Sequence, residues 1–145
     1  MMASTPAPLI GQRWLPALFL LWTVLGCIAF IMQSTQDLAA LARTDPDQAR
    51  IWAAMPLWAW LCYGIAVIAA LLGAAAMVLR RRGAVLLSLI GLIAVLLQFG
   101  YTFLGTDILQ TRGFVAAAAF PIVVILFSAA QLFYARLLKQ RGHLR

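Results

Sequence analysis

Residues 56–104 read PLWAWLCYGIAVIAALLGAAAMVLRRRGAVLLSLIGLIAVLLQFGYTFL, which is two long apolar runs separated by the four residues RRRG. Neither run contains an ionisable Asp, Glu, Lys, Arg or His outside that break. A helix needs about 20 predominantly apolar residues to cross the hydrocarbon core of a bilayer. Each run is long enough, so the stretch predicts a helical hairpin that crosses a membrane twice.

Two further apolar runs flank this hairpin, and the whole chain is 65% hydrophobic but only 10% charged. Such a composition is far from that of a soluble domain of 145 residues. In lipid every backbone group must be satisfied internally, which favours helices and excludes unpaired strands. The sequence predicts an all-α polytopic membrane protein of one domain, an up-down bundle of four transmembrane helices. The expected spans are residues 14–32, 56–79, 84–104 and 114–135.

The short loop Arg80, Arg81, Arg82 and Gly83 is the strongest orientation signal, because basic residues in short loops stay on the cytoplasmic side. Counting outward from it places both termini in the cytoplasm. Eight of the eleven basic residues then lie inside, and all four aspartates lie outside. The net charge of +7 therefore reflects orientation and does not indicate nucleic-acid binding, which needs clustered charges on a soluble surface.

The first span has a rival interpretation as a cleaved signal. Arg13 precedes an apolar stretch, and the Gly26-Cys27 pair within that stretch could mark a cleavage site. The apolar run continues to Met32, so we expect a retained span. Cys27 and Cys62 lie inside apolar runs and form no Cys-x-x-Cys motif, and we expect both to be free thiols.

The long outer loop, residues 33–50, carries signals for short interfacial helices. Ser34 or Thr35 is expected to cap the first of them, and Asp45 followed by Pro46 to begin the second. Pro56 predicts a kink or break where the second span starts, and Pro121 predicts a kink in the fourth span. The other outer loop, residues 105–113, is expected to be a simple turn.

Small and weakly polar residues recur at helical spacing in each span and predict the faces that pack together. Five residues gather near the outer face and form a candidate solute site or interhelical polar site: Gln33, Gln98, Tyr101, Thr102 and Trp58. Gln98 is expected to face the bundle interior and to form a hydrogen bond with another helix. Gln131 lies nearer the opposite end of its span, and its depth predicts that it belongs to no common site with Gln98.

Catalytic and cofactor constellations are not expected. The spans contain no histidine and no paired carboxylates for a metal or haem, and no nucleophile beside a base. We therefore expect no bound cofactor or metal and no enzymatic activity.

Several stretches together resemble a family of small four-helix bacterial inner-membrane proteins that often carry the generic label "sugar transporter". The likeness extends over nearly the whole chain. It rests on Leu21, Trp22, Leu25, Gly26, Ala29, Phe30, Met32, Gln33 and Thr35, on Met55, Pro56 and Trp58, on the triplet Arg80 to Arg82, on Gln98, Tyr101 and Phe103, on Pro121, and on Arg141, Gly142 and Leu144. Thr23 and His143 depart from the pattern, where asparagine and an aromatic residue are common.

The resemblance implies a multi-pass protein of the bacterial inner membrane. It implies membership of that family more than it implies any particular activity. Two functional interpretations remain open. The first is a non-enzymatic accessory or interaction subunit, whose partners are the lipid bilayer and another membrane protein or a second copy of the chain. The second is a small transporter of an uncharged, sugar-like solute, which a continuous cavity lined by Gln98 and Tyr101 would favour.

Overall fold

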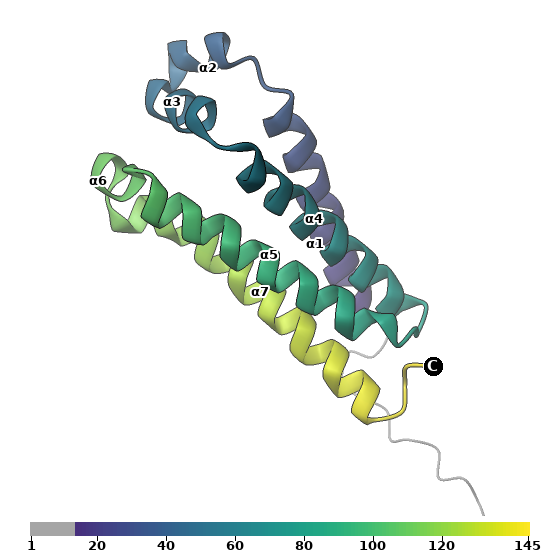
Figure 1. The fold of residues 1–145 in the computed structure, drawn as a ribbon. Helices are drawn as coiled ribbons and strands as arrows, with labels where there is room; N and C mark the ends of the chain where they lie inside the picture. Colours follow the sequence, from purple (N-terminus) through teal and green to yellow (C-terminus); the bar gives the residue numbers. More distant parts are fainter. Residues whose placement is uncertain (1–13) are drawn as a thin grey trace, which may run out of the picture.

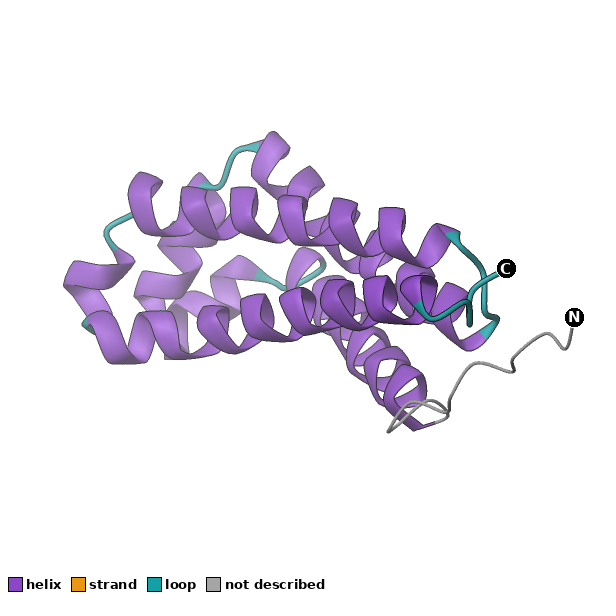
Figure 2. Ribbon diagram, turned by 90° about the horizontal axis from the view of Figure 1, so that it is seen from below, coloured by secondary structure: helices purple, strands orange, loops and turns teal. Residues whose placement is uncertain are grey.

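The computed structural model describes residues 14–145, and its ordered elements there are seven α-helices joined by short loops, with no strand (Figures 1 and 2). Four are long and apolar enough to cross a membrane: α1 (Trp14–Ser34), α4 (Leu57–Val78), α5 (Gly83–Gly105) and α7 (Phe114–Gln140). The three short helices are α2 (Leu38–Thr44), α3 (Pro46–Ala54) and α6 (Ile108–Arg112). The predicted four-span helical architecture is confirmed, and the last span continues beyond the expected residue 135.

The short helices and the arginine loop lie at opposite ends of the bundle (Figure 1). We call the end with α2, α3 and α6 the roof end. The end with the turn Arg80 to Arg82 and the chain's C-terminus is the arginine end. The predicted separation of Asp37, Asp45, Asp47 and Asp107 from the arginine triplet is thus present. Arg13, one of the eight basic residues expected on the cytoplasmic side, lies outside the described residues.

Capping residues explain where the short helices begin. Asp37, not Ser34 or Thr35, caps α2, because its carboxylate accepts hydrogen bonds from the backbone N–H groups of Ala39 and Ala40 at 2.9 and 3.3 Å. The hydroxyls of Ser34 and Thr35 instead donate to the carbonyl of Ile31, as expected of hydroxyls in a last helical turn. The expected Asp45-Pro46 start of α3 is confirmed, with Asp45 Oδ1 accepting from the N–H of Gln48 at 3.1 Å.

Prolines act differently in the two places where they were expected to disturb a helix. Pro56 separates α3 from α4, and the chain is extended at Met55 and Pro56, so the predicted break is confirmed. Pro121 lies inside α7, which remains helical on both sides of it. The loop after α5 is not the simple turn that was expected, because residues 108–112 form the helix α6.

Small residues let α4 and α5 approach closely along their length. An added Cβ at Gly91 would lie 3.2 Å from the backbone nitrogen of Ala70, and one at Gly73 would lie 2.8 Å from Ser88 Oγ. Packing then continues from α4 to α1 and from α5 to α7. This order of contacts leaves α1 and α7 as the two outer helices of the bundle, and the pairs α1–α4 and α5–α7 diverge towards the roof end (Figure 1).

The arginine end is filled by side chains. Its core includes Phe19 of α1, Met77 of α4 and Tyr134 of α7, and the ring of Phe19 lies 6.4 Å from that of Phe127 and 6.3 Å from that of Tyr134. The C-terminal residues complete this end, with Leu144 buried among them. Backbone hydrogen bonds join Arg145 to the α4–α5 turn, its N–H to the carbonyl of Arg80 at 2.6 Å and its carbonyl to the N–H of Arg82 at 3.0 Å. The arginine end is therefore closed by packing.

Candidate functional site

The interior of the roof half holds a cavity of about 500 Å³. Its floor comes from α4 and α5, its two walls from α1 and α7, and its roof from α3 and α6. Most of the lining is apolar, and the aromatic members are Trp22, Trp52, Tyr63, Phe99 and Phe120. At the end towards the arginine loop, the stacked rings of Trp22 and Phe127, 4.3 Å apart, bring α1 and α7 together.

Three of the five predicted site residues line this cavity: Gln33, Gln98 and Thr102. The other two, Trp58 and Tyr101, do not. Their rings contact each other edge to face at 5.2 Å, away from the cavity lining. The cause is helical phase: at about 100° per residue, Thr102 is turned about 40° from Gln98 in one sense and Tyr101 about 60° in the other, and the Tyr101 ring meets Trp58. The aromatic walls that were expected from Trp58 come from other rings.

Gln98 is the most informative polar residue of the cavity. Its position inside the bundle is confirmed, since it is only 8% exposed. The hydrogen bond predicted for its amide is wrong, because its side chain has no partner among residues 14–145 and instead lines the cavity. The residue is buried as a whole, but its amide borders the cavity and meets no protein group there. Its hydrogen bonds must therefore come from whatever occupies the cavity.

Four other polar groups that line the cavity are already occupied, whereas the Tyr63 hydroxyl, also on its lining, makes no hydrogen bond within residues 14–145. The hydroxyls of Thr23, Thr102 and Ser128 donate to carbonyls of their own helices, at 2.9, 3.1 and 2.9 Å. Gln131 also lines the cavity, so the prediction that it shares no site with Gln98 is wrong: the cavity runs along the helices and reaches both depths. Its amide, however, donates to the carbonyl of Ala70 at 2.9 Å and to Ser88 Oγ at 3.1 Å. Gln131 thus ties α7 to α4 and α5, and the polar groups of the cavity that have no protein partner nearer the roof end include the Gln98 amide and the Tyr63 hydroxyl.

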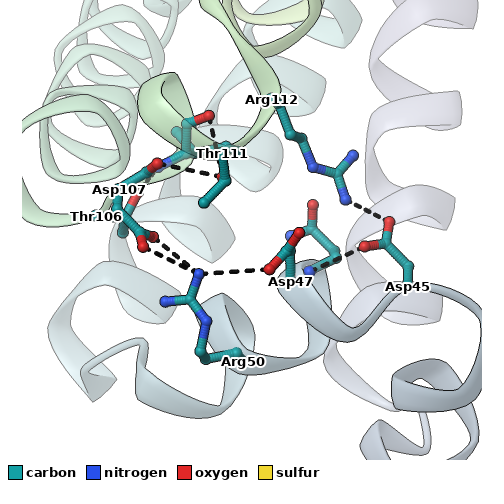
Figure 3. A network of polar contacts seen from close by, with 9 residues as sticks. Asp45, Asp47, Arg50, Thr106, Asp107, Thr111 and Arg112 are labelled. Atoms are coloured by element: carbon teal, nitrogen blue, oxygen red, sulfur yellow. Dashed lines mark hydrogen bonds and ion pairs between the residues drawn. The ribbon is translucent and has the colours of Figure 1, made fainter.

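Ion pairs that sequence reasoning did not bring together join α3 to α6 across the roof (Figure 3). Arg50 of α3 donates to both carboxylate oxygens of Asp107 at 3.1 Å and lies 3.7 Å from Asp47. Arg112 of α6 donates to Asp45, which caps α3. That hydrogen bond, together with the one from the backbone of Gln48, holds the pKa of the Asp45 carboxyl below its usual range. The carboxylate is therefore ionised at neutral pH, and the ion pair is present there.

Apolar contacts lie beneath these ion pairs. Ile51 of α3, Ile108 of α6 and Ala117 of α7 are buried against one another, with Trp52 and Phe103 beside them. Exposed ion pairs contribute only about 0–1 kcal/mol each, so the apolar contact is the larger part of the roof's stability. The roof connects the α1–α4 half of the bundle to the α5–α7 half at the end where the two halves diverge.

The two cysteines are free, as predicted. The Cys27 thiol lies 3.6 Å from the carbonyl of Val67, so it joins α1 to α4 as a small half-buried group. Among residues 14–145, no group of three or more His, Cys, Asp or Glu side chains is arranged to hold a metal ion.

The chain matches no known family, no curated protein and no solved structure. The resemblance to the four-helix family therefore stays a prediction. What the fold defines is a class: an integral membrane protein with four candidate spanning helices and a cavity in one half of its bundle.

Proposed function

We propose that the protein is a non-enzymatic integral membrane protein that binds a small, uncharged, amphipathic molecule in the roof-half cavity. The observation that carries this proposal is Gln98, a residue that is nine-tenths buried and whose amide lines that cavity without a protein partner. Binding sites for small molecules are typically about 300–1,000 Å³ and apolar, with a few polar groups that fix orientation. The cavity has this size and this make-up.

A sugar fits the lining less well than an amphipathic molecule does. Each hydroxyl of a sugar would lose its water on entry and would need a partner in the protein. At membrane depth the cavity offers few unoccupied polar groups, among them the Gln98 amide and the Tyr63 hydroxyl, since the hydroxyls of Thr23, Thr102 and Ser128 and the amide of Gln131 already have partners. The transport of a sugar-like solute is for this reason the weaker form of the proposal. Transport would also require the packed arginine end to open.

Binding can be tested with N-phenyl-1-naphthylamine, a neutral amphipathic fluorophore, added to the protein in phosphatidylcholine nanodiscs. We expect saturable energy transfer from tryptophan with one probe bound per chain. The variant Gln98→Leu is expected to weaken binding about tenfold, because one net hydrogen bond is worth roughly 1–1.5 kcal/mol.

The matched control is Gln36→Leu, which removes an exposed amide away from the cavity and should leave binding unchanged. Energy transfer that rises linearly with probe, as it does in empty nanodiscs, would contradict the proposal. So would equal affinities for the wild type and Gln98→Leu.

The accessory-subunit interpretation has one observation in its favour. Helix α1 buries only Pro16, Phe19 and Thr23 within the chain, which leaves most of its length open to lipid or to a partner helix. A photoreactive benzoylphenylalanine at Leu21, which is exposed on α1, is expected to give a discrete protein cross-link if α1 carries a partner. The same group at Leu86, exposed on α5, is the control. Lipid-only products at both positions would refute this role.

The orientation also remains a proposal: the arginine end faces the cytoplasm of a bacterial cell and the roof faces outward across the inner membrane. It is supported by the triplet Arg80 to Arg82 in a turn between two spans. A single cysteine at Gly83, in a cysteine-free background, should stay unlabelled by a membrane-impermeant maleimide in intact cells. Labelling of Gly83→Cys from outside would reverse the orientation.

A further inference from the structure

The cavity reaches the protein surface between α1 and α7. Two of its lining residues are also exposed large hydrophobic side chains, Leu25 of α1 at 53% and Phe120 of α7 at 63%. Ala116, also exposed, lies one turn before Phe120 on the same rim. On the side towards the arginine end, the Trp22–Phe127 stack closes the gap. The opening is therefore a lateral slot bounded by α1 and α7.

The slot lies at the depth of lipid chains. Leu25 is nine residues before the end of α1 at Ser34, which places it about 14 Å from the roof end of that helix. Phe120 is six residues into α7, about 9 Å from the start of that helix. Since the hydrocarbon core of a bilayer is about 30 Å thick, both side chains border the core and not the aqueous phase. The roof of α3 and α6, meanwhile, covers the cavity on the aqueous side.

The chemistry of the slot selects against charge. No Asp, Glu, Lys or His lines the cavity, and Arg112, at the roof, is paired with Asp45. An aliphatic chain matches the apolar walls, and one neutral oxygen-bearing group matches the unpartnered amide of Gln98. A charged headgroup brought to the depth of Gln98 would lose its hydration without gaining a counter-charge.

We propose that the occupant of the cavity is a neutral single-chain lipid, such as a monoacylglycerol, that enters from the membrane leaflet at the roof end through the slot between α1 and α7. This inference rests on the proposed binding function and names its ligand class. The chain lies between Leu25 and Phe120, and the oxygenated group receives or donates a hydrogen bond at Gln98.

The test uses a monoacylglycerol with a diazirine in its acyl chain, incorporated into phosphatidylcholine nanodiscs that hold the whole protein. After illumination, we expect labelling of residues 22–29 and 116–124 that unlabelled monoolein competes away. Labelling of exposed positions outside the cavity, such as Leu86 and Phe133, should be weak and should not saturate. Competition thus separates a binding site from ordinary contact with lipid.

Two variants of α7 make the test specific to the slot. Ala116→Trp places a large ring on the rim and should abolish the competable labelling. Ala119→Trp adds the same ring at an exposed alanine of the same helix that does not line the cavity, and should preserve it.

If the naphthylamine probe binds but lipid labelling is not competable, or survives in Ala116→Trp, then lipid entry is refuted and the binding function stands. If neither probe binds saturably, both proposals fail.

Discussion

Replacing Gly73 with valine is expected to destabilise the protein by at least about 2 kcal/mol, because overpacking a tight contact costs roughly 1–3 kcal/mol and an interhelical hydrogen bond is lost with it. A Cβ at this position would lie 2.8 Å from Ser88 Oγ, 3.0 Å from Gln131 Nε2 and 3.1 Å from the backbone nitrogen of Ser88. The backbone of α5 cannot yield locally, so α4 and α5 must separate. This separation would also pull Ser88 away from the Gln131 amide.

The matched control is Gly100→Val, in the interior of α5. A Cβ at Gly100 meets nothing within 4 Å, so this variant measures the intrinsic effect of valine in a membrane helix without a clash. Unfolding of both variants in mixed micelles of dodecyl maltoside and sodium dodecyl sulfate gives the two free energies. If Gly73→Val lowers the free energy of unfolding no more than Gly100→Val does, then α4 and α5 do not pack closely at Gly73.

The four spans could be predicted from the sequence because the thickness of a bilayer fixes the length of an apolar helix, independently of any neighbour. The start of α3 at Asp45-Pro46 could also be predicted, because the capping residue and the proline both act within one helical turn. Capping of α2 by Asp37 was missed because it is not fixed by local sequence alone. Ser34, Thr35 and Asp37 are all good capping residues, and the choice among them depends on how far α1 continues.

The cavity needed tertiary information. The sequence identified Gln33, Gln98 and Thr102 by depth and helical phase, which are local properties. It could not show that the two helix pairs diverge, and so it treated the site as a layer at a single depth and separated Gln98 from Gln131. The ion pairs Arg50–Asp107 and Arg112–Asp45 join residues that are 57 and 67 positions apart in the chain, and no local pattern indicates them.

The two buried glutamines make opposite predictions about stability, and this contrast is the second large effect that we expect. Gln131→Leu should destabilise the protein by about 1–2 kcal/mol, in the upper range for interhelical hydrogen bonds in membranes. It removes the donor to Ala70 and Ser88 and leaves the Ser88 hydroxyl without that contact. Gln98→Leu should be neutral or stabilising in ligand-free protein, because it replaces an amide that has no partner with an apolar side chain of similar volume.

The same unfolding titration measures both variants, and the order of their free energies decides between the roles of the two residues. If Gln98→Leu lowers the free energy of unfolding as much as Gln131→Leu does, then the Gln98 amide has a protein partner. In that case it is not available to a ligand. If Gln98→Leu keeps full stability while its affinity for the naphthylamine probe falls, stability and binding are separated at one side chain. A purely structural glutamine would not produce that separation, because its removal would lower both quantities together.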